Sequence, residues 1–122
     1  MDVIAMAADA LKPIADDGID VAQGWYDGNR KDCHIKLWKL SGADGEHSDD
    51  NPETERADVQ ITIFSTKDEV ELQKRVKKLM RAAGASFLGE DQDAMEPQDG
   101  IYIKPSRYQF LEEAQEDGRS ND

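Results

Sequence analysis

An alternating segment that runs directly into an amphipathic helix constrains the fold of this chain more than any other feature. Val59, Ile61 and Ile63 alternate with polar positions across residues 58–64, which is the period of a strand with one buried face. Phe64 falls on the side opposite these three residues, so we expect it to be exposed.

The helix that follows is predicted to run for about four turns and to end near Ala83, with Gly84 as its stop. A weak capping pattern, Ser65 with Asp68 three residues later, precedes it. At about 100° per residue, the apolar side chains share one stripe and the basic side chains share the opposite side. The stripe consists of Leu72, Val76, Leu79, Met80 and Ala83, and the basic side consists of Lys74, Lys77, Lys78 and Arg81.

The first part of the chain is predicted to contribute a short helix and two strands. Residues 2–12 show helical spacing of apolar side chains, and Pro13 is expected to end that helix because proline lacks a backbone N–H. Residues 19–25 and 33–38 alternate with a period of two, and an Asp-Gly-Asn turn signal at 27–29 lies between them. This arrangement predicts an antiparallel β-hairpin with a longer loop.

Two further strands are predicted after the long helix. Residues 86–88 are a short candidate, and residues 101–111 are a longer one. Pro105 predicts an edge position or a bulge in the longer strand, because proline cannot donate to the strand ladder. The order α-β-β-β-α-β-β predicts one α+β domain over residues 1–112, with an antiparallel sheet of about four to five strands packed against two helices.

Three acidic stretches interrupt or follow these elements. Residues 41–57 and 90–100 lack any periodic pattern and are predicted to be solvated loops, and residues 113–122 are predicted to be a disordered acidic tail. The whole chain carries 27 acidic and 15 basic residues, a net charge of −12. A surface this negative repels phosphate backbones and anionic lipid, so we expect neither nucleic-acid nor membrane binding.

The targeting signals of other compartments are missing from the sequence as given. The N-terminal residues lack the basic segment and apolar run of a secretory leader. No apolar stretch approaches the ~20 residues that span a bilayer, and a lone cysteine fits a reducing compartment. We therefore expect a soluble protein made in the cytosol.

The residues that carry catalytic or metal chemistry are too few, and too poorly spaced, to predict a site. Cys33 is the only cysteine, and His34 and His47 are the only histidines, whereas a zinc site needs about four ligands. Neighbouring strand residues point to opposite faces, so we assign Cys33 to the core and His34 to the surface. Residues 44–51 have the oxygen density of a calcium loop without its spacing, and whether the acidic loops bind divalent cations stays open.

No nucleophile motif or phosphate loop is present either. The carboxylates sit in predicted loops, without an apolar pocket that would separate their pKa values for acid–base work. We therefore expect no catalytic residue, no metal, no cofactor and no enzymatic activity.

The layout of the chain resembles the small tail-completion or tail-terminator proteins of long-tailed bacteriophages and prophages. The segments that carry the resemblance are 47–51 (HSDDN), 57–65 (ADVQITIFS), Leu79-Met80, 85–87 (ASF) and 101–110 (IYIKPSRYQF). The family typically shows a Ser-Asp-Asp or Ser-Asp-Asn loop, a strand of the VQIxIxS type and a closing strand that contains Lys, Arg and Phe. Ala-Ser-Phe at 85–87 departs from the Gly-Phe that is usual in the family. The resemblance therefore rests on the order of the segments along the chain.

The resemblance implies a virion structural protein without catalytic residues. Such proteins assemble as rings, usually six-fold, at the head-proximal end of the tail tube, where they stop tube growth and meet the head-completion or neck proteins. It also implies a location in the virion tail or neck, and in the host bacterial cytoplasm during assembly.

Charge suggests how copies of the chain could join into a ring. Residues 44–58 carry seven acids and one base, and residues 67–81 carry six bases and three acids. An acidic loop of one subunit against the basic helix of the next would make a head-to-tail contact, which closes into a ring when the rotation allows. Two solvated faces that never meet remain the competing interpretation. The candidate interface residues are Asp49, Asp50, Glu53, Glu55, Lys74, Lys77, Lys78, Arg81 and Phe64.

Trp25 and Trp38 are further candidates for apolar contacts, with core packing as the alternative for each. Other functions stay open on the sequence. A head–tail connector or minor capsid subunit is the nearest one. An acidic adaptor that binds a basic partner, or a DNA mimic that inhibits a nucleic-acid enzyme, belongs to a different class.

Overall fold

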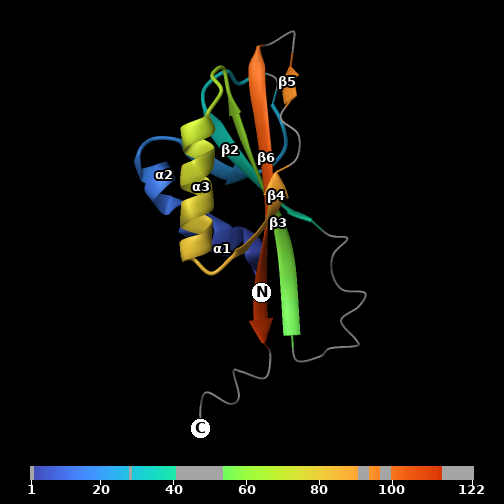
Figure 1. Cartoon of the computed structure of the whole chain (residues 1–122). Coiled ribbons are helices and arrows are strands. Elements are labelled where there is room, and N and C mark those ends of the chain that lie inside the picture. Colours follow the sequence, from blue (N-terminus) through green and yellow to red (C-terminus); the bar gives the residue numbers. More distant parts are fainter. Residues whose placement is uncertain (1, 28, 41–53, 91–93, 97–99, 114–122) are drawn as a thin grey trace.

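A six-stranded β-sheet forms the centre of the computed structural model, and helices cover one of its faces (Figure 1). The structure describes residues 2–27, 29–40, 54–90, 94–96 and 100–113. The elements there are α1 (Val3–Ala10), α2 (Lys12–Asp16), β1 (Asp20–Gln23), β2 (His34–Leu40), β3 (Thr54–Ser65), α3 (Val70–Ala82), β4 (Ser86–Glu90), β5 (Ala94–Glu96) and β6 (Ile101–Glu113). The strand order is β1-β2-β3-β6-β4, and β5 pairs with the start of β6. The fold is α+β and the sheet is mostly antiparallel, which confirms the predicted fold class.

The N-terminal helix forms as its spacing predicts, but the chain does not leave the helical conformation at Pro13. The backbone N–H of Ala5 donates to the Asp2 carboxylate at 3.1 Å and caps α1. Pro13 then lies in the first turn of α2, where its missing N–H costs no helical hydrogen bond. The two helices together bury Val3, Ala7, Leu11 and Ile14 against the sheet.

The predicted hairpin is wrong, because β1 and β2 pair in parallel. The turn at 27–29 does form, with the Arg30 N–H donating to the Asp27 carbonyl at 3.0 Å. However, it lies inside a crossover that returns the chain to the same end of the sheet. Arg30 contacts Asp20 at 2.8 Å and Asp32 at 2.6 Å, so it ties together the starts of both strands. Two parallel neighbouring strands begin at the same end of a sheet, and the ion pairs of Arg30 hold the starts of β1 and β2 together at that end.

α3 packs its apolar stripe on the sheet as predicted, but it begins later than its capping pattern suggests. Leu72, Val76 and Met80 are buried, Leu79 is partly buried, and Ala83 is exposed. Gly84 follows the helix with φ +97°, a left-handed conformation that favours glycine at a helix end.

Asp68 does not cap this helix. Ser65 Oγ instead donates to Glu69 at 2.7 Å and accepts from the Lys67 N–H at 3.1 Å. Asp68 turns to β6, where its carboxylate contacts Lys104 Nζ at 2.7 Å. Ser65 and Glu69 are hydrogen-bonded to each other and Asp68 contacts Lys104 of the sheet. The helix therefore begins only at Val70.

β6 is an interior strand of the sheet, so the edge position predicted from Pro105 is wrong. β3 pairs along one side of β6, with Thr62 opposite Pro105. On the other side, β4 pairs with residues 106–109 and β5 pairs with residues 101–103. Pro105 falls between these two partners, where its missing N–H interrupts neither ladder. β5 also lies within the stretch 90–100 that the sequence assigns to a loop.

β3 and β6 are longer than their neighbours and continue past them as a two-stranded ribbon. β2 pairs with residues 58–64 of β3, and β4 pairs with residues 106–109 of β6. Among the described residues, 54–57 and 110–113 therefore pair only with each other. We call these two segments the β3–β6 ribbon. Figure 1 shows both strands extending beyond the end of α3.

The ribbon corrects the predicted boundaries of two acidic stretches. Residues 54–57 belong to β3 and not to the loop predicted over 41–57, and Glu113 is the last residue of β6. Charged residues at these positions hide the alternation that marks a strand. Residues 41–53 and 114–122, where the remainder of the predicted loop and tail falls, lie outside the described residues.

Candidate subunit interface

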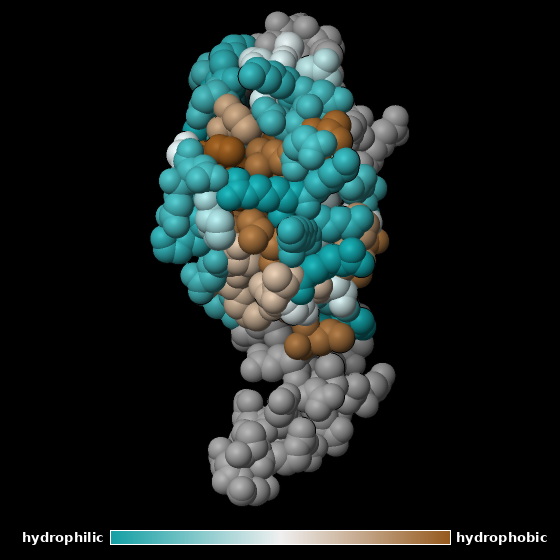
Figure 2. All heavy atoms as spheres, turned by 60° about the vertical axis from the view of Figure 1, so that its left-hand side comes forward, coloured by the Kyte–Doolittle hydropathy of each residue, from teal (hydrophilic) through white to brown (hydrophobic). Residues whose placement is uncertain are grey.

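The basic side of α3 is where the sequence places it, on the surface that faces away from the sheet. Lys74, Lys78 and Arg81 are exposed. Lys74 makes a 3.6 Å contact with Glu71 on the same helix. Among the residues that the structure describes, no carboxylate pairs with Lys78 or Arg81. Figure 2 shows the helix-covered side of the molecule, where hydrophilic surface surrounds separate hydrophobic patches.

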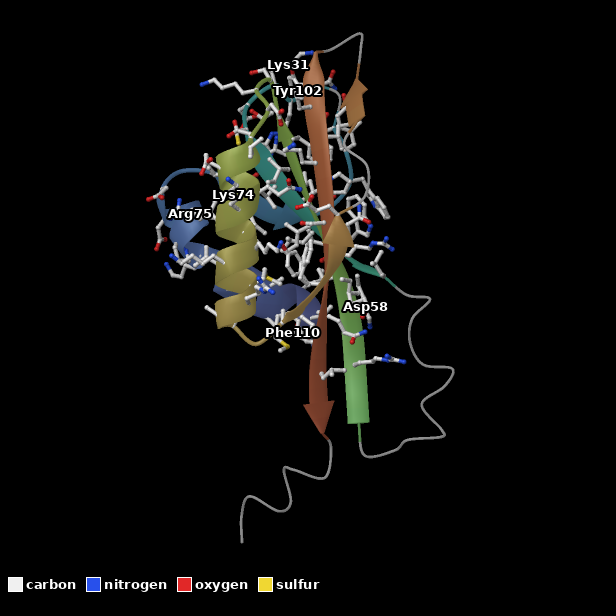
Figure 3. All side chains as sticks on the ribbon, in the orientation of Figure 1. Lys31, Asp58, Lys74, Arg75, Tyr102 and Phe110 are labelled. Atoms are coloured by element: carbon white, nitrogen blue, oxygen red, sulfur yellow. The ribbon has the colours of Figure 1, made fainter. Side chains whose placement is uncertain are left out.

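Two other cations of α3 are used within the chain. Arg75 donates to the Asp17 carboxylate at 2.7 Å, which joins α3 to the end of α2. Figure 3 shows Arg75 on the α2 side of α3 and Lys74 close to it on the same helix. Lys77 Nζ lies 4.0 Å from the centre of the Phe87 ring, a cation–π distance. We call the remaining set, Lys74, Lys78 and Arg81, the α3 basic face.

The acidic half of the predicted interface is described only where it enters the sheet. Asp49, Asp50 and Glu53 lie outside the described residues. Glu55 is in the β3–β6 ribbon, with Glu112 as its direct cross-strand partner. The charged ribbon side chain that the structure describes is that of Arg56, which is exposed.

The other ribbon pair is exposed and partly apolar. Arg56 and Leu111 are cross-strand partners, and Leu111 is 56% exposed. Next to them, Ala57 and Phe110 are buried in the core. Figure 3 shows Phe110 near the lower end of the helix-covered side. The ribbon is therefore anchored at its base, and its end lies outside the core.

Phe64 is buried, so the prediction that it is exposed is wrong. Its side chain is 2% exposed. The crossover between β1 and β2 lies over this side of the sheet, with the Tyr26 ring 5.3 Å from the Phe64 ring, and His34 stacks on Phe64 at 5.1 Å. Periodicity gives the face of a strand correctly, but it does not show that a later or earlier segment covers that face.

Trp25 is the most exposed of the large apolar side chains on the described surface. It is 71% exposed, and its ring lies 4.8 Å from that of Trp38, which is partly buried. The sequence assigns Trp25 to a strand, but β1 ends at Gln23 and Gly24 follows with φ +153°. L side chains rarely adopt that conformation, and Trp25 follows it beyond the end of β1, packed beside Trp38.

The predicted orientations of Cys33 and His34 are also wrong. His34 is fully buried, and its Nδ1 lies 2.8 Å from the Asp32 carbonyl. Cys33 is only partly buried. Burial, reinforced by the nearby negative charge of Glu69, raises the pKa of the Cys33 thiol to about 11. A thiol held in its protonated form is a poor nucleophile and a poor metal ligand.

Potential metal ligands do not gather among the described residues. No group of three or more His, Cys, Asp or Glu side chains among them could hold a metal ion. No described helix is long and apolar enough to cross a membrane. The features that remain among the described residues are the α3 basic face and the exposed Trp25 beside the partly buried Trp38. No protein-family model and no curated protein sequence matches this chain significantly.

Proposed function

We propose that this chain is a structural subunit of a long-tailed bacteriophage, a tail-terminator or tail-completion protein. Copies of it form a ring, six-fold in this proposal, at the head-proximal end of the tail tube. The ring stops tube growth and joins the tube to the neck proteins. Its site of action is the virion, after assembly in the cytoplasm of the bacterial host.

The observation that carries this proposal is the separation of charge on the folded chain. The β3–β6 ribbon holds Glu55, Glu112 and Glu113, and the α3 basic face holds three cations without a carboxylate from the sheet. A contact in which acidic segments of one copy meet the α3 basic face of the next is heterologous, the kind that generates rings.

The sequence resemblance supports the same function. The segments that resemble the family fall mainly on β3, the end of α3, β4 and β6, and these elements follow one another in the order that the resemblance implies. The exposed basic face of α3 is the surface that we assign to assembly. A virion subunit requires only such surfaces.

Immunogold electron microscopy tests the location directly. Phage particles induced from the strain that encodes the chain would be labelled with antibodies raised against the purified protein. We expect label at the head–tail junction and none on the tail tip. Label confined to the capsid shell, or absent from particles that contain the other tail proteins, would overturn the proposal.

Deletion of the gene provides a second readout. Because a terminator stops tube polymerisation, we expect its loss to give headless tail tubes of irregular, increased length. Tails of normal length and normal attachment to heads would contradict a terminator role.

A further inference from the structure

We propose that β1 of one copy pairs with β4 of a second copy in antiparallel orientation, so that one β-sheet continues from copy to copy. This contact rests on the ring assembly proposed above and names the strands through which its copies join. Every copy offers β1 to one neighbour and β4 to the other, so the contact is head-to-tail.

The first reason is that both outer edges of the sheet lack a neighbouring strand among the described residues. β1 and β4 are the ends of the strand order β1-β2-β3-β6-β4. The Gly24 N–H donates to the Leu37 carbonyl of β2 at 3.2 Å, and successive residues of a strand direct their backbone groups to alternate sides. Val21 and Gln23 therefore direct their N–H and C=O groups away from β2. A row of such groups is a template on which another strand can pair.

The second reason is the direction of the two edge strands. β1 is parallel to β2, whereas the pairs β2–β3, β3–β6 and β6–β4 are antiparallel, so β1 and β4 run in opposite directions. A second copy placed beside the first in the same orientation therefore offers an antiparallel pair, the more stable kind per residue. Gln23 and Glu90 lie in the same row of the sheet. Full pairing of β1 with β4 thus offsets each copy along the strands, as closed sheets require.

The third reason is that the described side chains give the two edges opposite charge. Residues 9–20, which lead through α2 into β1, hold four acids and one base, and residues 74–90, which lead from α3 into β4, hold five bases and one acid. Arg75 and Asp17 pair with each other within the chain, which reduces both balances without changing their sign. The crossover at 27–32 adds two acids and two bases to the β1 side. Charge complementarity therefore selects β4, and not a second β1, as the partner of β1.

The sequences of the two edge strands leave them able to pair. Exposed edges are commonly blocked by lysine, proline or a bulge, and neither β1 (Asp-Val-Ala-Gln) nor β4 (Ser-Phe-Leu-Gly-Glu) contains lysine or proline. β4 has a bulge between Phe87 and Gly89. We therefore expect a short contact, to whose stability the flanking charges contribute.

Proline substitution at Gln23 tests the pairing. The N–H of this exposed residue points away from β2, so Gln23→Pro removes a donor from the outer edge and keeps the β1–β2 hydrogen bonds. Gln23→Ala is the matched control, because it removes the side chain and retains the N–H. In native mass spectrometry, we expect Gln23→Pro to need at least about a fivefold higher concentration than Gln23→Ala for half-assembly of the ring. Equal assembly of the two folded variants would overturn the inference.

Hydrogen exchange on the unsubstituted chain gives an independent result if the proline variant folds poorly. Exchange would be compared between the dilute monomer and the assembled ring. We expect the amides of Val21 and Gln23 to exchange rapidly in the monomer and slowly in the ring. The amide of Ala22, which is directed to β2, should be protected in both and is the internal control. Outer amides that exchange equally fast in both states would contradict the contact.

A short bismaleimide linker tests the direction of pairing in a Cys33→Ser background. Gln23 and Ser86 are exposed and uncharged, and antiparallel pairing brings the end of β1 close to the start of β4. Within one chain these residues lie on the two outer strands of the sheet, about 19 Å apart or more, so a short link between them joins two copies. We expect Gln23→Cys/Ser86→Cys to give a ladder of covalent oligomers that ends at the size of the ring.

The matched variant Gln23→Cys/Glu90→Cys should cross-link much less, because Glu90 is at the other end of β4, about 13 Å from Ser86. A ladder from this variant in place of the first would show parallel pairing. Covalent dimers from either single-cysteine variant would show a symmetric contact. Either result would overturn the inference.

The combined results separate this inference from the proposed function. If rings form but the outer amides of β1 stay unprotected, the edge contact is wrong and the ring proposal stands. If the edges pair in a ring but antibody label is absent from the head–tail junction, the contact stands and the terminator role fails. If the unsubstituted chain forms no ring, alone or on tail tubes, both proposals fail.

Discussion

Lys104 is a charged side chain on the helix-covered side of the sheet, and one of its contacts is with the carboxylate of Asp68 on the loop before α3. Its side chain is 5% exposed, and its Nζ lies 2.7 Å from Asp68, whose side chain is 51% exposed. A buried ammonium is expensive to desolvate, so the carboxylate stabilises the fold mainly by offsetting that cost. The pair also fixes where the chain turns from β3 into α3.

We therefore expect Asp68→Asn to lower the free energy of unfolding by about 1–2 kcal/mol, less than the ~3–5 kcal/mol of a fully buried pair because Asp68 faces water on one side. Asp9→Asn is the matched control, since Asp9 is exposed on α1 and should change stability by less than about 0.5 kcal/mol. Urea denaturation followed by circular dichroism measures both. Equal effects of the two substitutions would show that the ion pair contributes nothing.

Cys33 is predicted to be a slow nucleophile. With a pKa of about 11, about 0.1% of it is thiolate at pH 8, against roughly a quarter of a free cysteine. A more basic thiolate is a better nucleophile, which offsets about tenfold of this difference in thiolate population. The reaction of Cys33 with a disulfide reagent should therefore be about tenfold slower, or more, than that of a free cysteine.

The rate should rise with pH until the thiol titrates near its raised pKa. Glu69→Gln removes a nearby negative charge that raises the pKa, so this variant should react faster at pH 8. A Cys33 that reacts at the rate of free cysteine would contradict the burial that the structure gives it.

Residue-level predictions from the sequence succeed where a side chain obeys one period and fail where another segment covers it. The stripe on α3, except for the exposed Ala83, and the apolar positions of α1 follow helical spacing, and the structure confirms them. Alternation assigns Phe64 and His34 to the surface, because it places them opposite the core. They are buried since the crossover carries Tyr26 over that face, and this tertiary packing leaves no mark in the period of either strand.

At the scale of elements, the sequence predicts the strand β3 and the helix α3 well because their patterns are long and regular. It misses the parallel pairing of β1 with β2, since a turn signal between two strands looks the same in a hairpin and in a crossover. It also misses the β3–β6 ribbon, whose glutamates resemble those of the adjoining acidic stretches. The pattern thus predicts the basic face of α3, and it does not predict that the acidic stretches continue into two paired strands.

The end of α3 depends on the backbone conformation of Gly84. Its φ is +97°, which costs roughly 1 kcal/mol for a residue with a Cβ. We expect Gly84→Ala to lower the melting temperature by several degrees and Gly84→Asn to lower it less, because asparagine tolerates the left-handed region better. No space limitation is involved, since nothing lies within 4 Å of an added Cβ. Differential scanning calorimetry would show the order, and equal losses would argue against a conformational cause.

At the scale of the whole molecule, a net charge of −12 opposes self-association unless the opposite charges are segregated. The described residues place three exposed cations together on α3, and the sequence concentrates acids in residues 44–58. Attraction between such opposite charges is screened by salt, because the Debye length falls from about 10 Å at 0.1 M to about 3 Å at 1 M. We therefore expect the ring to weaken steadily as sodium chloride rises over this range. Sedimentation velocity measures this change, and rings that strengthen with salt would point instead to apolar contacts such as Trp25.

The most direct test of the central claim is native mass spectrometry of the purified chain beside the variant Lys74→Glu/Lys78→Glu/Arg81→Glu, at an ionic strength of about 0.15 M. Circular dichroism would first show that both are folded. The account predicts a closed ring of a single stoichiometry for the unsubstituted chain and a monomer for the variant. A ring that survives this charge reversal unchanged would contradict it.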